Sequence, residues 1–419
     1  MIRITTLPNG LRVLTETMTH VRSATIGLWC DVGSATEPAE RRGISHLLEH
    51  MVFKGTPRRT ARAIAEEMDA VGGELNAMTD KETTCFYAHV VDRHLPRAVD
   101  VLADMLQHAL FDGDDLAREQ QVVLEEIKMY DDSPGEVVHD RFARTLWSGA
   151  NLGDPTIGYA HTVKAIGREE LLRWRATRYA PSTVFVTAAG NVDHDAVVQL
   201  AAHAFADFGG DVVPPAAEVP RFTQGLDVTI DETEQAYVLL GTPGLAMRDE
   251  RRYALSVLDT ILGGGMSSRL FQSVREQRGL AYEISTFQQS YRAAGLFGVS
   301  AGCTPERVQE CVDVIGDELD RLLHDGVAVD ELERAREHLK GNLTLALEST
   351  FNRMSRLARN VLVHGRQIST EEVEEAFDAV DAAQVDALAR ELLAPAQRGL
   401  CVLGPASVRG VRLPGEAAA

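Results

Sequence analysis

Residues 101–130, VLADMLQHALFDGDDLAREQQVVLEEIKMY, predict a helix, a short turn and a second helix. Residues 314–343, VIGDELDRLLHDGVAVDELERAREHLKGNL, repeat this arrangement, with Leu332 in the place of Leu116. Each half of the chain also opens with strand-like segments and closes with a helix followed by an apolar strand. Because these elements recur in the same order, the sequence indicates a duplication of one folding unit.

The predicted strands pair through short turns, and the helices follow in runs, which is typical of an α+β fold. Strands are expected at 11–17, 24–34, 83–91, 226–232, 236–244 and 295–302. We therefore predict two duplicated α/β-layer lobes, each an antiparallel or mixed sheet with helices packed on it, facing each other around a chamber. The segment GGDVVPPAAEVPRFTQG (209–225) is rich in glycine and proline and predicts a linker between an N-terminal lobe (1–208) and a C-terminal lobe (226–419).

The overall composition narrows the class of protein. The chain has 419 residues, of which 45% are hydrophobic and 25% charged, as in globular proteins. The net charge of −20 argues against nucleic acid as a partner, because phosphate binding needs a basic surface. Such acidity is typical of a solvated surface, and an acidic interior that attracts cationic peptides is the alternative.

Location is inferred from what the sequence lacks. No apolar stretch reaches the ~18–20 residues that span a bilayer, so no membrane association is expected. The first residues, MIRITTLPNGLRVLTE, lack a basic segment followed by an apolar block, so no export signal is expected. The five cysteines are scattered and form no CxxC motif, which favours reduced thiols in a cytoplasmic protein.

The chemistry is concentrated in ISHLLEHMVFKGT (44–56). On a helix, His46, Glu49 and His50 share one face, because residues three and four apart are neighbours. Two imidazoles one turn apart can bind a single metal ion, and nitrogen ligands suit Zn²⁺. The glutamate between them is placed to accept a proton from an activated water. This H-x-x-E-H order is that of a zinc-peptidase motif.

A catalytic zinc needs a third protein ligand. The segment LAREQQVVLEEIKMYDD (116–132) offers Glu119 and Glu126, seven residues apart on one face of a helix predicted to be mostly buried. Carboxylates on a buried face are unfavourable unless a cation compensates them. From the residues alone, either glutamate could be the ligand, and a pair of helical histidines without such a helix would be ordinary surface residues.

These residues resemble the inverted zinc metallopeptidases of the pitrilysin and insulinase family, and within it the branch similar to the mitochondrial processing peptidase with single-chain bacterial members. HLLEHMVFKGT is similar to the family's zinc helix, and Glu126 lies 76 positions after His50, as the family's third ligand does. The resemblance implies one Zn²⁺ per chain, bound by His46, His50 and Glu126, with Glu49 as the base. It also implies that Glu119 is an accessory glutamate beside the ligands.

Two more stretches are similar to the family. GGELNAMTDKETTCFYA (72–88) resembles its edge strand, which implies that Asn76 and Ala77 contact the substrate backbone. LGGGMSSRLFQSVREQRGLAY (262–282) resembles its glycine-rich loop, which implies that Arg275 and Tyr282 bind and act on the substrate. Without the resemblance, this arginine and tyrosine would be ordinary helix-surface and strand residues.

The function implied is hydrolysis of unstructured peptides by zinc-activated water, either as general oligopeptide turnover or as processing of leader peptides. The second half has no HxxEH, and Asn342 stands where Glu126 stands in the first half, so one half would hold the metal and the other clamp substrate. The resemblance implies pairing of two chains, here as a homodimer. The alternatives are a structural subunit that lost catalysis and a zinc hydrolase of non-peptide amides.

Overall fold

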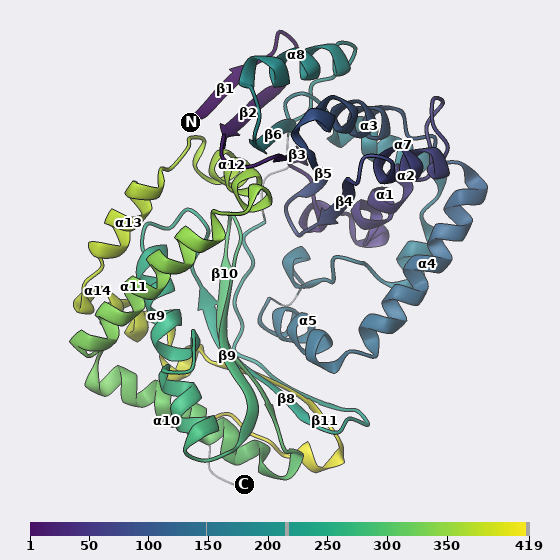
Figure 1. Cartoon of the computed structure of the whole chain (residues 1–419). Helices are drawn as coiled ribbons and strands as arrows, with labels where there is room; N and C mark the ends of the chain where they lie inside the picture. Colours follow the sequence, from purple (N-terminus) through teal and green to yellow (C-terminus); the bar gives the residue numbers. More distant parts are fainter. Residues whose placement is uncertain (148, 214–217, 416–419) are drawn as a thin grey trace. The chain divides into compact units, whose positions relative to one another are not determined.

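The computed structural model describes residues 1–147, 149–213 and 218–415, and Figure 1 shows the whole chain. The described residues form two compact units. Unit 1 comprises residues 1–128, 155–213 and 345–367, and unit 2 comprises residues 129–154 without residue 148, then 218–344 and 368–415.

Unit 1 is built on a six-stranded sheet with the order β1-β2-β6-β3-β5-β4. Its strands are β1 (Ile2–Thr6), β2 (Arg12–Thr17), β3 (Ser23–Cys30), β4 (Glu74–Thr79), β5 (Thr84–Val91) and β6 (Val184–Gly190). Its helices are α1 (Ile44–Val52), α2 (Ala61–Asp69), α3 (Leu95–His108), α4 (Gly113–Asp131, which runs on into unit 2), α6 (Ala160–Ala165), α7 (Arg168–Arg178), α8 (His194–Ala204) and α12 (Thr350–His364). Strands β2 and β6 pair in parallel and the other neighbours pair antiparallel, so the sheet is mixed as predicted.

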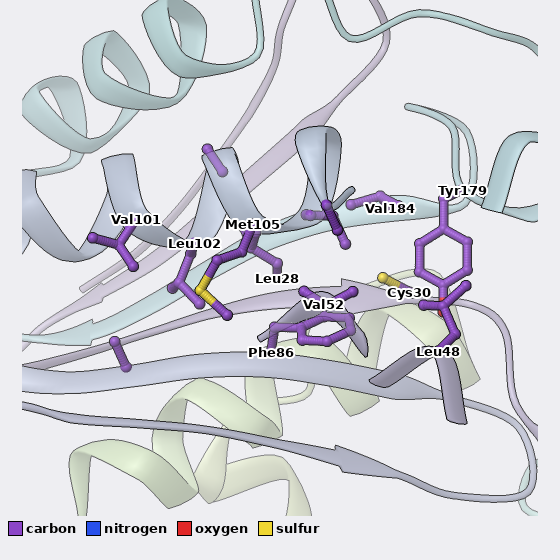
Figure 2. Packing of buried hydrophobic residues seen from close by; sticks show 14 of the residues in the cluster. Leu28, Cys30, Leu48, Val52, Phe86, Val101, Leu102, Met105, Tyr179 and Val184 are labelled. Atoms are coloured by element: carbon purple, nitrogen blue, oxygen red, sulfur yellow. The ribbon is translucent and has the colours of Figure 1, made fainter. Parts of the chain in front are cut away.

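The core of unit 1 fixes the orientation of α1. Leu47, Leu48 and Met51 of this helix are fully buried, as the sequence pattern predicts. Figure 2 shows Val52 beside Phe86 of the sheet and Leu48 beside Tyr179, all within one core cluster. With this apolar face held against the sheet, the polar residues of α1 are turned away from the core.

Unit 2 has a five-stranded sheet with the order β7-β11-β8-β10-β9. Its strands are β7 (Leu226–Ile230), β8 (Ala236–Gly244), β9 (Ala281–Ser290), β10 (Gly295–Cys303) and β11 (Gly399–Gly404). Its helices are α5 (Pro134–Leu146), α9 (Arg252–Gly263), the π-helix η5 (Phe271–Glu276), α10 (Val308–Asp325), α11 (Val329–Ala346), α13 (Thr370–Asp378) and α14 (Ala382–Leu392).

Short 3₁₀ turns occur in both units, at η1 (Ser34–Thr36), η2 (Ala39–Arg41), η3 (Asp92–His94), η4 (Asn151–Gly153), η6 (Pro305–Arg307), η7 (Pro395–Gln397) and η8 (Ala406–Val408).

The two sheets confirm the duplication. Strands β7, β11, β8, β10 and β9 take the same order as β2, β6, β3, β5 and β4, and unit 1 adds only β1. The β7–β11 pair is parallel, like the β2–β6 pair. Two sheets with one topology, each followed by a pair of long helices, are what duplication of one unit would produce.

The predicted domain boundaries are wrong for two helices, because each compact unit is built from separate segments of the chain. Helix α12 comes from the second half but packs on the sheet of unit 1, where Met354 accepts a hydrogen bond from Trp29 Nε1 at 3.1 Å. Helix α5 comes from the first half but belongs to unit 2, where Arg141 pairs with Asp227 at 2.9 Å. The described residues of the predicted linker, 209–213 and 218–225, form neither helix nor strand, while 214–217 lie outside the described residues.

Helix α4 also differs from expectation. The sequence predicts a mostly buried helix, but Val122 is 44% exposed, while Leu116, Glu119 and Val123 are buried. Only one face of α4 packs against unit 1, because the helix is amphipathic.

Candidate metal centre and catalytic residues

Helix α1 is held at its N-terminus by a buried carboxylate. Gly43 takes the N-cap position with φ of +91°, and glycine has no side chain that could cap the helix. The backbone amides of Gly43 and Ser45 instead donate to Glu37 Oε2 and Oε1 at 2.7 and 2.8 Å. A carboxylate at this end satisfies unpaired amides and complements the helix dipole. Glu37 therefore sets the position of the turn that carries His46.

Burial raises the pKa of Glu37 to about 7 from its ordinary 4.5, although the amides of Ser45 and Gly43 oppose this shift. Between these two pH values the folded protein binds more protons than the unfolded chain, so stability falls as pH rises. Glu37→Gln removes this titration. Relative to this variant, we expect wild type to lose up to about 3 kcal/mol of unfolding free energy between pH 5 and pH 8.

Denaturant unfolding of the metal-free protein at both pH values measures this difference. Glu40→Gln is the control, because Glu40 is exposed on the same connecting segment. The prediction would be contradicted if the difference in unfolding free energy between wild type and Glu37→Gln were the same at pH 5 and at pH 8.

The structure brings the three predicted ligands together. The ligand atoms of His46, His50 and Glu126 lie within 4.8 Å of one another, and they form the one such group found among the described residues. Glu126 Oε2 lies 4.0 Å from His46 Nε2 and 3.5 Å from His50 Nε2. The two imidazole rings are 4.6 Å apart, as expected for positions one helical turn from each other.

The charges of this group suit a divalent cation. Burial and the neighbouring His50 lower the pKa of His46 to about 3, so its imidazole is neutral, the form that binds metal. In the described part of the chain, the Glu126 carboxylate lies within ion-pair distance of these two imidazoles and of no lysine or arginine. Two nitrogen donors and one carboxylate, with no other cation at Glu126, fit Zn²⁺.

Glu49 lies on the same helix beside the two histidines. Thr79 of β4 donates a hydrogen bond from Oγ1 to Glu49 Oε2. Burial raises the pKa of Glu49, while the Thr79 hydroxyl and His50 lower it and Glu126 raises it further. A carboxylate whose pKa is raised by burial accepts a proton more readily, as a general base must.

Glu119 lies behind His50. The His50 Nδ1–H donates to Glu119 Oε2 at 3.2 Å, and Lys54 Nζ lies 2.6 Å from Glu119 Oε1. A carboxylate on the far nitrogen of a metal-binding histidine orients the ring. The geometry therefore separates the two glutamates that the sequence left open: Glu126 faces both imidazole Nε2 atoms, and Glu119 contacts His50 from the opposite side of the ring.

Asn76 and Ala77 lie on β4, the strand at the edge of the unit 1 sheet. Asn76 is exposed, and its Oδ1 accepts a hydrogen bond from the Ala77 amide at 2.8 Å. Strand β4 also carries Thr79, so the edge strand is directly linked to Glu49. An edge strand with open backbone groups can pair with an extended peptide.

Arg275 and Tyr282 both belong to unit 2. The Arg275 guanidinium carbon lies 5.3 Å from the centre of the Tyr282 ring, within the range of a cation–π contact. Tyr282 is 79% exposed, so its hydroxyl is available to a ligand. The structure thus brings this predicted pair together, although the two residues lie on different elements, η5 and β9.

Family models match both parts of the chain. The model described as insulinase, peptidase family M16, matches residues 12–160, and the model described as peptidase M16 inactive domain matches residues 165–339. The chain belongs to the insulinase family, M16. The description of the second model agrees with the lack of an HxxEH motif in the second half of the sequence.

Several relatives are similar to this chain over almost their full length. An uncharacterized zinc protease of Streptomyces coelicolor is 44% identical and covers 96% of this chain and 90% of its own. One of Bacillus subtilis is 41% identical and covers 94% of this chain and 96% of its own. The recognition of the family from the sequence is therefore confirmed, and its relatives' names support a zinc-dependent peptidase.

Two solved structures share the fold of this chain. A peptidase M16 inactive domain from Pseudomonas fluorescens has a TM-score of 0.90 at 20% identity and covers 96% of this chain and 98% of its own. A protease from Helicobacter pylori has a TM-score of 0.90 at 22% identity and covers 97% and 99%. The α+β fold predicted from the sequence is confirmed by these neighbours.

Three residues near the centre were not predicted from the sequence: Glu37, Lys54 and Thr79. Lys54 lies within the HMVFKGT segment, four residues after His50, and this spacing could have indicated that it shares a side with the metal ligands. Glu37 and Thr79 have no comparable signal, because their contacts with α1 depend on tertiary packing.

Within the described ranges, no helix is both long and apolar enough to cross a membrane.

Proposed function

We propose that this M16 protein is a zinc-dependent endopeptidase that hydrolyses unstructured oligopeptides or leader peptides with a metal-activated water. The observation that supports this most strongly is the convergence of His46, His50 and Glu126 to within 4.8 Å, with Glu49 on the same helix. All four groups needed for hydrolysis are present, which favours an enzyme over a structural subunit of the same fold.

His46, His50 and Glu126 would hold the zinc ion, one per chain. When bound, zinc lowers the pKa of a coordinated water and polarises a carbonyl group. Glu49 accepts the proton of the attacking water and passes it to the leaving amine. The hydrogen bond from Thr79 holds the Glu49 carboxylate towards β4. Glu119 orients the His50 ring through Nδ1.

The substrate would add to the open edge of the sheet at β4. An extended peptide bound there takes the backbone hydrogen bonds of a further strand. One donor for such a peptide is the Ala77 amide, which in this structure donates to Asn76 Oδ1. Such binding reads the peptide backbone more than its side chains, so the selectivity for sequence is modest.

Arg275 and Tyr282 would contact the substrate, with the Tyr282 hydroxyl stabilising the developing oxyanion. We expect Tyr282→Phe to lower kcat about 10²-fold, the usual effect of removing one such donor, with zinc content unchanged. Tyr253→Phe is a matched control, because Arg252 lies over the Tyr253 ring at 4.3 Å in a similar pair. Equal activity of the two variants in a peptide-cleavage assay would contradict a role for Tyr282.

The functional proposal is tested by incubating the purified protein with a mixed peptide library, with and without a zinc chelator, and reading the products by mass spectrometry. We expect cleavage of peptides that stops on chelation and returns when zinc is restored. Cleavage that is unaffected by the chelator, or no cleavage by the zinc-loaded protein, would contradict the proposal. Cleavage only of precursors at one position would favour leader-peptide processing over general turnover.

The proposed assembly is a homodimer in the cytoplasm. The zinc motif and the pair formed by Arg275 and Tyr282 occur on one chain, so no second type of subunit is required to supply them. Gel filtration coupled to light scattering measures the mass directly against the 45.8 kDa of one chain. An active monomer would contradict the dimer and leave the zinc chemistry unaffected.

A further inference from the structure

Lys54 follows the metal-binding helix and contacts its supporting glutamate. Its Nζ lies 2.6 Å from Glu119 Oε1, and the other oxygen of the same carboxylate accepts from His50 Nδ1 at 3.2 Å. Lys54 thus reaches His50 through one shared group. The Lys54 amide donates to Met51 O at 3.2 Å, which keeps residue 54 attached to the last turn of α1.

The Glu119 carboxylate needs this partner. Glu119 is buried, with 7% of its surface exposed, whereas the Lys54 side chain is 31% exposed. A buried carboxylate is unfavourable unless it is paired and hydrogen-bonded. Among the described residues, Lys54 is the one lysine or arginine within ion-pair distance of Glu119. Lys54 therefore supplies the compensating charge.

The two contacts also fix the direction of the carboxylate. With Oε1 held by Lys54, Oε2 points to His50 Nδ1, and His50 Nε2 on the other side of the ring lies 3.5 Å from Glu126 Oε2. Without the ammonium group, rotation of the Glu119 carboxylate would no longer be restrained at Oε1. His50 would lose the acceptor that orients its ring, and such acceptors tune metal affinity.

We propose that Lys54 is a positioning residue of the metal centre, acting on His50 through Glu119. This inference rests on the proposed function, since it concerns the zinc site. It assigns to the lysine of HMVFKGT a task separate from metal binding and from proton transfer. Its action is electrostatic and directional, so an arginine at this position should retain part of it.

Zinc affinity of the full chain, measured by competition with a chromophoric chelator, tests the proposal. We expect Lys54→Met to weaken zinc binding about 10-fold or more, the usual effect of losing such support, and Lys54→Arg to recover part of the loss. Lys128→Met is the matched control, because Lys128 forms a 2.6 Å pair with Glu125 on the exposed side of α4. This control should bind zinc like wild type.

A double-mutant cycle separates positioning from general stabilisation. Because Lys54 acts through Glu119, Lys54→Met combined with Glu119→Gln should bind zinc no more weakly than Glu119→Gln alone. Two outcomes would overturn the inference: additive losses of zinc affinity in the double variant, or a Lys54→Met variant that binds zinc like wild type and shows only a lower melting temperature. In both cases, zinc binding by the wild-type protein would still uphold the proposed function. Failure of the wild type itself to bind zinc would overturn both.

Discussion

We expect Glu49→Gln to abolish peptide hydrolysis while the protein keeps its zinc. The glutamine side chain has nearly the same size but cannot accept a proton from water, and general-base catalysis contributes about 10²–10⁴-fold in rate. Zinc content should stay near that of wild type, because Glu49 is not among the three converging ligands. Single-turnover cleavage of a defined peptide and elemental analysis of the same sample measure both quantities.

The control for this variant is Glu125→Gln, which removes an exposed carboxylate paired only with Lys128 among the described residues. It should retain full activity and zinc. Activity of Glu49→Gln within a few-fold of wild type would exclude Glu49 as the base. Loss of zinc together with activity would instead place Glu49 among the groups that hold the metal.

We expect His46→Ala, His50→Ala and Glu126→Gln each to remove bound zinc and, with it, activity. A site with three protein ligands is left with two, too few for a stable catalytic zinc centre. Elemental analysis of freshly purified protein should find about one zinc per chain in wild type and close to none in these variants. The unfolding midpoint of wild type should also rise with added zinc, because binding to the folded state stabilises it.

His89→Ala is the matched control for the histidine variants, because His89 is an exposed residue of β5. It should keep its zinc. Glu119→Gln discriminates between the two glutamates of α4: it should weaken zinc binding about 10–100-fold without abolishing it, as expected for a group that only orients a ligand. Equal zinc loss from Glu119→Gln and Glu126→Gln would contradict the assigned roles.

Much of the fold could be predicted from the sequence because its signals are local. Residues 236–244 were predicted as a strand and form β8, and residues 84–91 of the predicted 83–91 form β5. Strand β1 was missed, since its five residues are partly or fully exposed and its apolar alternation is limited to Ile2 and Ile4. Strand β9 was missed for a similar reason, because this edge strand is mostly polar and partly exposed.

The exchange of helices α5 and α12 could not be predicted. Each helix has an apolar face, but an apolar face alone does not specify which of two similar sheets it covers. Because the two sheets share one topology, the choice depends on the specific partners, such as Trp29 for α12 and Asp227 for α5. These contacts join residues far apart in the sequence.

For the metal centre, the sequence by itself determined which residues of α1 share a face, because helical geometry places residues three and four apart together. It also determined that Glu119 and Glu126 share a face of α4. Only the tertiary structure decided which glutamate faces the imidazoles. It also decided that Glu37 holds α1, that Thr79 holds Glu49 and that Lys54 holds Glu119. Local spacing fixes direction within one helix, whereas the distance between two helices is set by the packing of their apolar faces.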